Sequence, residues 1–528
     1  MLFNSYSFIF FFLPITLAGF FALGRVSATT AAAWLTAASL VFYGWWNPLF
    51  VILLLASVIF NYRMGLALAI SDDDRWAGHR KLLLAAAIGT NLAVLGYFKY
   101  ANFFLTTIST LSGSDIHGLT IILPLGISFF TFTQIAYLVD AFRGEVKEPR
   151  LIHYALFVTY FPHLIAGPVL HHKEMMPQFA EPRTYRLNWS DFAVGITIFF
   201  IGLFKKVVIA DGIAPLVSVV FGNAATGEHP ALFDAWGGAL AYTMQLYFDF
   251  SGYSDMAIGL SRMFGVKLPL NFNSPYKSVN VIEFWRRWHM TLSRFLRDYL
   301  YIPLGGSRKG QVRRYESLMI TMLLGGLWHG AAWNFVLWGG LHGLYLVINH
   351  GWRWMRSSFG ADLSRSSRMG RVGAQLLTFV AVVIGWVFFR AATSDAALRI
   401  LGGMAGMNGV ALPQAVAAHL GSLKPTLQAM GIEIMHGGGG QFVRTYLWLA
   451  LLLPAVMFWP NTQEVMARFA PGLDPRTERS GAAAPAAVAR LVALRWAPTP
   501  LWALAMAAIS VWGLLSLSHP SEFLYYQF

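Results

Sequence analysis

Long uncharged and mostly apolar runs alternate with short polar stretches along the chain. A helix needs about 20 apolar residues to cross the hydrocarbon core of a bilayer. The run 26–62 is long enough for two such helices, and the aromatic, turn-like segment 43–48 separates them. The pattern predicts an all-α polytopic membrane protein with about 11 membrane segments. Stretches without Asp, Glu, Lys or Arg include 1–24, 26–62, 82–98, 116–139, 151–172, 212–227, 235–248, 317–352, 372–389, 445–463 and 496–521.

Several of these runs are shorter or more interrupted than a full membrane span. The run 317–352 is long, but the glycine pairs Gly325-Gly326 and Gly339-Gly340 are expected to interrupt it. Irregular backbone at membrane depth is tolerated where protein surrounds it, so we expect broken or re-entrant helices. The first run, 1–24, lacks the basic start of a signal peptide and predicts a retained membrane helix.

The same pattern divides the chain into three parts. Residues 1–390 form the predicted membrane core with a motif region at 262–345, and residues 391–444 a loop region outside the membrane. Residues 445–528 are expected to form C-terminal membrane helices with a Pro/Ala/Arg-rich loop at 471–485. Basic residues favour the cytoplasmic side, so those after the first, third and fifth segments predict an N-terminus outside. Beyond residue 170 the alternation of charge no longer defines the topology.

Composition excludes several classes of protein. Only 12% of the 528 residues are charged, against about 25% in an average soluble domain, which excludes a soluble multidomain enzyme. The chain has no cysteine, so thiolate nucleophiles and thiolate metal sites are excluded. Neither a zinc-binding histidine motif nor a nucleotide-binding glycine motif in its required context occurs. We therefore expect no metal, no bound cofactor and no nucleic-acid partner.

The basic excess is concentrated in one segment. Residues 262–314 contain eleven basic and two acidic residues, which is +9 of the formal net charge of +14. One reading is a cytoplasmic loop held by anionic lipid headgroups. However, aromatic residues alternate with the basic ones at 283–301, and Trp285, Trp288 and Leu292 share one helical stripe. This spacing predicts an amphipathic helix at the membrane interface, followed by a tight turn at 303–307.

Histidines and carboxylates within apolar runs are the other candidates. His329 lies in an uncharged run of 36 residues, where an ionisable group marks either a functional site or a hydrogen bond between helices. His342 is 13 residues away, which on one continuous helix separates the two by about 140° and predicts separate sites. We expect His163 to be structural and His171 and His172 to lie at the interface. Asp249 and Asp255 either pair with the nearby arginines or hold a substrate hydroxyl.

Three long motifs then become recognisable. They are Glu283 to Ser293 (EFWRRWHMTLS), Leu296 to Gly306 (LRDYLYIPLGG) and Leu324 to Gly330 (LGGLWHG). They closely resemble the membrane-bound O-acyltransferase family, in particular its bacterial alginate O-acetylation branch. Further agreement comes from 95–103, 123–130, 161–168 and 247–259. The resemblance covers roughly residues 1–390.

The resemblance implies a fold and a reaction. The fold would be a ring of tilted helices around a central funnel in a multi-pass protein of the bacterial inner membrane. The protein would transfer an acetyl or other acyl group from a cytoplasmic thioester donor, acetyl-coenzyme A or an acyl carrier protein, across the membrane. The product would be an O-acetylated secreted or cell-wall polysaccharide such as alginate. Expected partners are a periplasmic acetyltransferase, the polysaccharide synthesis machinery and membrane lipids.

The resemblance also implies roles for individual residues. His329 would be the general base and His289 a second catalytic residue. His289, Trp328 and Asn334 would orient the reactants or stabilise an oxyanion. The guanidinium group of arginine can donate two parallel hydrogen bonds to phosphate oxygens. The basic segment would therefore bind the phosphates of the acyl donor. The expected substrate-binding residues are Trp285, Arg286, Arg287, Arg294, Arg297, Asp298, Trp328 and Asn334.

Two other functions remain open at this point. One is transfer of D-alanine to teichoic acid by a related enzyme. The motifs resemble those of the alginate branch, which argues against this function. The other is a transporter or channel, since intramembrane histidines and an arginine-lined vestibule would serve ion or solute passage equally well.

Overall fold

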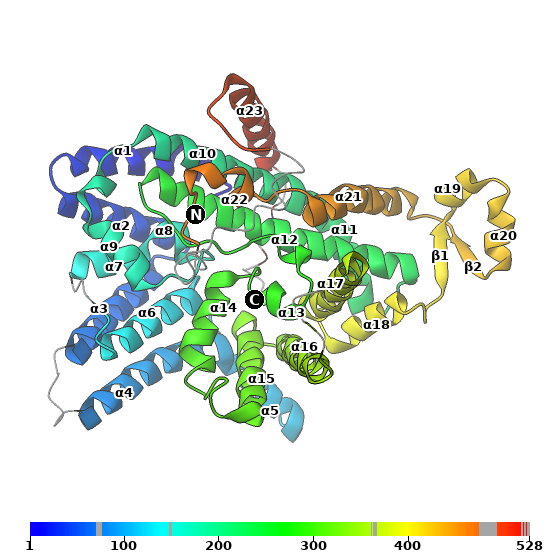
Figure 1. Ribbon diagram of the computed structural model, residues 1–528, viewed down its shortest axis with the longest axis horizontal. Helices are drawn as coiled ribbons and strands as arrows, with labels where there is room; N and C mark the ends of the chain where they lie inside the picture. Colours follow the sequence, from blue (N-terminus) through cyan, green and yellow to red (C-terminus); the bar gives the residue numbers. More distant parts are fainter. Residues whose placement is uncertain are drawn as a thin grey trace.

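Most of the residues that the structure describes are helical (Figure 1). The computed structural model describes residues 1–69, 77–146, 150–360, 362, 367–474, 494–518, 521 and 524. Most of the loop predicted at 471–485 lies outside these residues. Six described helices are long and apolar enough to cross a membrane, and two shorter apolar helices accompany them. The prediction of an all-α polytopic membrane protein is therefore confirmed.

Most helices of the N-terminal third lie at one end of the molecule, and α5 lies nearer its middle (Figure 1). The predicted division of the run 26–62 is confirmed, because α2 ends at Gly44 and α3 begins at Leu49. The helix α4 continues through the π-helix η3 into α5. The elements are η1 (Phe8–Phe12), α1 (Leu13–Gly24), α2 (Ala28–Gly44), α3 (Leu49–Ala69), α4 (Ala77–Leu95), η3 (Gly96–Tyr100), α5 (Ala101–Ser112), α6 (Ile127–Phe142), α7 (Leu151–Thr159), α8 (Phe161–Leu164), α9 (His172–Ala180) and η4 (Pro182–Tyr185).

Two long helical segments form the centre. The first runs through α10 (Trp189–Phe204), η5 (Lys205–Ala210) and α11 (Asp211–Ala225), and the second is α12 (Leu232–Met263). Glycines allow α10 and α12 to approach closely, since a Cβ on Gly259 would lie 2.5 Å from the Gly195 carbonyl oxygen. Lys205 pairs with Asp255 at 2.7 Å, and Lys206 pairs with Asp211 and Asp249 at 2.6 Å. The two predicted carboxylates thus pair with lysines rather than with arginines.

The motif region folds differently from its prediction in one respect. The elements here are η6 (Pro275–Lys277), α13 (Val281–Trp285), α14 (Met290–Leu296) and the π-helix η7 (Arg297–Tyr301). The continuous amphipathic helix is wrong, because the chain breaks between α13 and α14 and His289 adopts a left-handed φ of 43°. Trp288 and Leu292 are buried in the core rather than at an interface. The predicted turn follows, with positive φ at Gly305 and Gly306.

The next two helices are α15 (Gly310–His329) and α16 (Trp333–Ser358), followed by α17 (Arg368–Arg390). The expected interruptions at the two glycine pairs are wrong, because both pairs lie inside helices. A Cβ on Gly326 would meet the Phe335 carbonyl oxygen at 2.2 Å, and one on Gly339 the Met322 carbonyl oxygen at 2.3 Å. The glycines therefore let α15 and α16 pack backbone to backbone. The chain reverses instead between His329 and Trp333.

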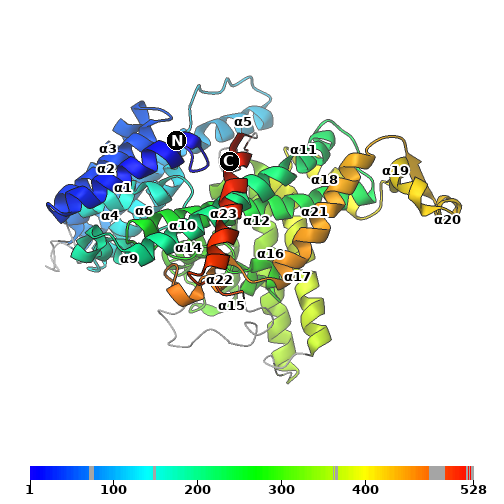
Figure 2. The same ribbon diagram turned by 90° about the horizontal axis from the view of Figure 1, so that it is seen from above.

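The C-terminal third contains a small extension and further helices. Strands β1 (Val410–Pro413) and β2 (Ile432–Met435) are parallel, with Val410 opposite Ile432. Figure 1 places them with α19 and α20 at the end of the molecule farthest from α1 to α4, and Figure 2 shows α19 and α20 at that end as well. The remaining elements are α18 (Ser394–Met404), α19 (Gln414–Ala417), η8 (Ala418–Leu420), α20 (Leu423–Ala429), α21 (Gly439–Phe458), α22 (Thr462–Val465), η9 (Ala467–Phe469), α23 (Pro500–Leu515) and η10 (Ser516–Ser518).

Candidate active site

Two buried histidines come together where short and broken elements meet. His329 is the last residue of α15, and His289 directly precedes α14. Their ring centroids are 6.2 Å apart, although the residues are 40 positions apart in the chain. The two residues expected to be catalytic therefore lie in one place.

Aromatic rings enclose His329. Its ring lies 5.0 Å from that of Trp328 and 5.1 Å from that of Trp338, and the Phe389 ring is at 5.3 Å. His342 also contacts the Trp338 ring, at 4.9 Å. His329 and His342 therefore contact the same tryptophan ring, although the sequence predicts separate sites for them. The predicted separation of about 140° assumes one continuous helix, whereas the chain reverses after His329.

The end of α15 is held by a cation from a distant helix. The Lys99 ammonium donates to the carbonyl oxygens of Trp328 at 2.5 Å and His329 at 3.4 Å, and to Ser128 Oγ at 3.3 Å. The Tyr100 hydroxyl donates to the Leu327 carbonyl at 3.0 Å. The last carbonyls of a helix have no donor within the helix, and a positive charge is favourable there. Lys99 and Tyr100 thereby fix the backbone that carries His329.

Sequence reasoning missed these two residues as part of the site. They belong to the motif 95–103, which served only as evidence of resemblance. A signal was available, since Lys99 interrupts an otherwise apolar segment at membrane depth, where a charge marks a functional candidate. Its partners, however, lie 229 and 230 residues away.

A cavity of about 240 Å³ reaches His329 and Lys99. One wall is the segment from Ile122 to Phe129, which connects α5 to α6 and begins α6. The cavity is mostly apolar, with Lys99, Ser128 and His329 as its polar lining. Its remaining lining residues are Trp46, Ile165 and Trp328.

His289 is held on a different side. Its Nδ1 lies 3.1 Å from Asn271 Oδ1, and its ring meets that of Phe250 edge-on at 4.7 Å. The Trp328 ring lies 6.1 Å from it. Trp328 thus contacts both histidines.

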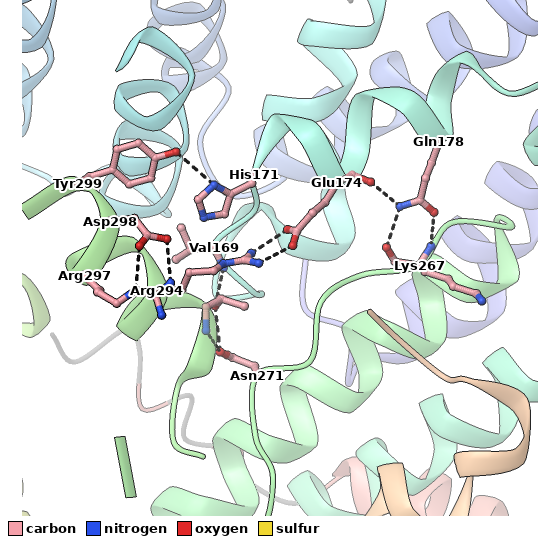
Figure 3. Close-up of polar contacts among 11 residues, drawn as sticks. Val169, His171, Glu174, Gln178, Lys267, Asn271, Arg294, Arg297, Asp298 and Tyr299 are labelled. Atoms are coloured by element: carbon pink, nitrogen blue, oxygen red, sulfur yellow. Dashed lines mark hydrogen bonds and ion pairs between the residues drawn. The ribbon is translucent and has the colours of Figure 1, made fainter. Parts of the chain in front are cut away.

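Most of the arginines expected to bind the donor are engaged in ion pairs. Arg287 pairs with Glu283 at 2.7 Å, and Arg294 forms a two-pronged pair with Glu174 at 2.5 and 2.8 Å (Figure 3). Arg297 pairs in the same way with its neighbour Asp298 at 2.8 and 2.9 Å. These partners neutralise three of the four arginines, and Asp298 is occupied as well.

Arg286 has different neighbours. It is exposed, and together with Arg353 it lies close enough to act electrostatically on His350. Arg314 donates to the same His350 ring, with Nη2 2.9 Å from Nδ1. The concentrated positive charge thus includes Arg314 and Arg353, on α15 and α16. The sequence did not indicate Arg353, which lies outside the basic segment.

The other predicted site residues have structural partners. The Asn334 amide donates to the Ala391 carbonyl at 2.8 Å and accepts from Ser394 Oγ at 2.7 Å. It therefore joins the start of α16 to the end of α17 and the start of α18. Trp285 packs against the rings of Trp338 and His342, at 5.8 and 5.3 Å.

The remaining candidate histidines have partners within the protein. His163 Nε2 lies 2.8 Å from the Phe157 carbonyl, in agreement with a structural role. His171, predicted at the membrane interface, contacts the Tyr299 hydroxyl at 3.2 Å (Figure 3). His172, for which the same is predicted, pairs with the buried Asp140 at 3.3 Å. Within the described ranges, no group of three or more His, Asp or Glu side chains is placed to hold a metal.

Fold and site together define a polytopic membrane protein with a buried histidine pair, a cavity reaching one histidine and basic residues nearby. Such a site suits transfer of a group to a hydroxyl. The chain belongs to the membrane-bound O-acyltransferase family, whose model matches residues 127–384. It is therefore an O-acyltransferase.

Curated relatives agree with this assignment. The chain is 43% identical to a peptidoglycan O-acetyltransferase of Helicobacter pylori, over 78% of this chain and 81% of that protein. It is 40% identical to a probable alginate O-acetylase of Pseudomonas aeruginosa over the full length of both. A teichoic acid D-alanyltransferase of Streptococcus thermophilus is 28% identical over 51% of this chain and 69% of that protein.

Proposed function

We propose that this protein transfers an acetyl group from a cytoplasmic thioester donor across the membrane for O-acetylation of a secreted or cell-wall polysaccharide. The observation that carries the proposal is the buried pair of His329 and His289 at the end of α15. The names of the relatives support acetyl as the group and a polysaccharide as the final acceptor, with alginate and peptidoglycan as examples. Lower identity over half the chain disfavours D-alanyl transfer.

The two substrates approach from opposite faces in this proposal. The cavity beside His329 is walled by the segment after α5, which lies outside if the basic residues near positions 80 and 143 are cytoplasmic. The acceptor hydroxyl enters there. In this proposal Arg286, directly after α13, Arg314 on α15 and Arg353 on α16 face the cytoplasm and attract the phosphates of acetyl-coenzyme A or an acyl carrier protein.

The reaction follows from the groups present. His329 removes the proton from the acceptor hydroxyl as its oxygen attacks the thioester carbonyl carbon. The carbon–sulfur bond then breaks, and the protonated His329 returns the proton to the leaving thiolate. Trp328 contacts both histidine rings and restricts their orientation. With no cysteine in the chain, no acyl-cysteine intermediate forms.

The surroundings of the enzyme follow from the same proposal. It resides in the bacterial inner membrane and passes the acetyl group to a periplasmic acetyltransferase partner. That partner works with the polysaccharide synthesis machinery. Lipids surround the helices, whose exposed large apolar side chains are numerous.

The proposal is tested in cells that lack the gene and carry a plasmid copy. Wild type should restore ester-bound acetate on the polymer, and His329→Ala should not, with equal protein in the membrane. His117→Ala, which changes an exposed histidine, serves as the control. Restored acetylation by His329→Ala would refute the enzymatic role of the site, and restored ester-linked D-alanine would favour the teichoic acid reaction.

A further inference from the structure

A chain of hydrogen bonds runs from the backbone to the second histidine. The Val169 N–H lies 2.9 Å from Thr291 Oγ1, which in turn lies 2.9 Å from Asn271 Oδ1. The same Oδ1 receives the Thr291 N–H at 3.4 Å and is 3.1 Å from His289 Nδ1. Figure 3 shows Val169 and Asn271 at the two ends of the portion drawn.

The direction of each bond in this chain is determined. A backbone N–H only donates, so Thr291 Oγ1 accepts from Val169, and its own hydrogen goes to Asn271. The Thr291 N–H also points at the same Asn271 atom, which must therefore be the amide oxygen and not the nitrogen. Since that oxygen only accepts, His289 donates to it through Nδ1–H.

This arrangement fixes the tautomer of His289. The ring is fully buried against Phe250 and Trp328, where an uncompensated positive charge is costly. A neutral ring that carries its proton on Nδ1 has its lone pair on Nε2. His289 is thereby an acceptor at Nε2 and cannot donate a hydrogen bond from that atom to an oxyanion.

Asn271 also holds the backbone of His289. The left-handed φ of 43° at this non-glycine residue is unfavourable. The Met290 N–H donates to the Asn271 carbonyl oxygen at 2.9 Å. Both the main chain and the side chain of Asn271 therefore stabilise the turn at His289. Asn271 itself is completely buried. Residues with a strained backbone persist only where surrounding contacts hold them in place, and such residues are common at active sites.

We propose that Asn271, supported by Thr291, is a positioning residue. It keeps the proton of His289 on Nδ1, so that Nε2 of His289 accepts a hydrogen bond from His329. His289 accepts from the N–H of the His329 ring, directly or through one water, across the 6.2 Å between ring centroids. The other nitrogen of His329 then carries the lone pair that removes the acceptor proton. This inference rests on the proposed function, with His329 as the base.

The test measures polymer-bound acetate in cells, per amount of protein in the membrane. Asn271→Ala removes the acceptor of His289 Nδ1–H, and the resulting misorientation should lower acetylation roughly 10-fold or more. Asn271→Asp keeps an acceptor oxygen in place and should recover most of the loss. The matched control is Asn273→Ala, two residues away, whose side-chain oxygen accepts from Asn461 and which should behave as wild type.

A second pair of variants covers poor folding of the first. Thr291→Val removes the hydroxyl that donates to Asn271, whereas Thr291→Ser keeps it, so the valine variant should acetylate less than the serine variant. Wild-type acetylation by Asn271→Ala would overturn the inference, as would equal losses in Asn271→Ala and Asn271→Asp at normal protein levels. If those variants do not accumulate, equal acetylation by the two Thr291 variants overturns it. Failure of the proposed function itself would appear separately, as acetylation by His329→Ala.

Discussion

Replacement of Lys99 by methionine should impair acetyl transfer by loosening the end of α15. Methionine keeps the apolar stem but removes the ammonium that donates to the carbonyls of Trp328 and His329. Hydrogen bonds that involve a charged group contribute about 1.5–3 kcal/mol, and a buried carbonyl left without a donor costs a similar amount. A loss of about 2–3 kcal/mol in the free energy that holds His329 in place corresponds to a rate roughly 30- to 160-fold lower.

The matched control is Tyr100→Phe. It removes a neutral hydrogen bond to the Leu327 carbonyl on the same helix end, worth about 1 kcal/mol, and leaves the charge in place. The assay is polymer-bound acetate per amount of membrane protein, accompanied by thermal unfolding in detergent to compare overall stability. If Lys99→Met acetylates as well as Tyr100→Phe at equal protein levels, the cation does not hold the catalytic end of α15.

Three further changes test the packing and the charges. Gly326→Ala should destabilise the protein by about 1–3 kcal/mol, because its Cβ meets the Phe335 carbonyl oxygen at 2.2 Å, whereas Gly89→Ala meets nothing within 4 Å; thermal unfolding of the two variants should differ accordingly. Lys206→Met leaves Asp211 and Asp249 buried without their cation, which should cost about 3–5 kcal/mol and sharply lower accumulation in the membrane. Arg286→Gln should weaken binding of coenzyme A to the purified protein, while Arg313→Gln, which breaks an exposed pair with Glu316, should leave it unchanged; equal affinities would place the phosphates elsewhere.

Local sequence patterns predicted the helices well where apolar runs end in polar or turn-forming residues. The division at 43–48 is an example, since Asn47 and Pro48 interrupt the helix by their own chemistry. The same approach failed at 283–301. There Asn271, from outside the segment, fixes a turn at His289 that helical spacing does not reveal.

The candidate site shows the same limit. His329 and His289 could be selected because of their motifs, but their proximity depends on the reversal after α15. The partners of the arginines could not be predicted, since Glu174 reaches Arg294 across 120 residues. The predicted interruptions at the glycine pairs are wrong because glycine both breaks helices and permits close packing. Which of these occurs depends on the facing helix.

Transfer across the membrane at His329 is the central claim, and right-side-out membrane vesicles test it most directly. Vesicles from cells that also make the periplasmic partner and the polymer are loaded inside with acetyl-labelled coenzyme A. Label should appear outside in ester linkage with the wild-type protein and not with His329→Ala at the same protein level. Equal external label from both proteins, or none from wild type when acetylated polymer forms in the same cells, would contradict the account.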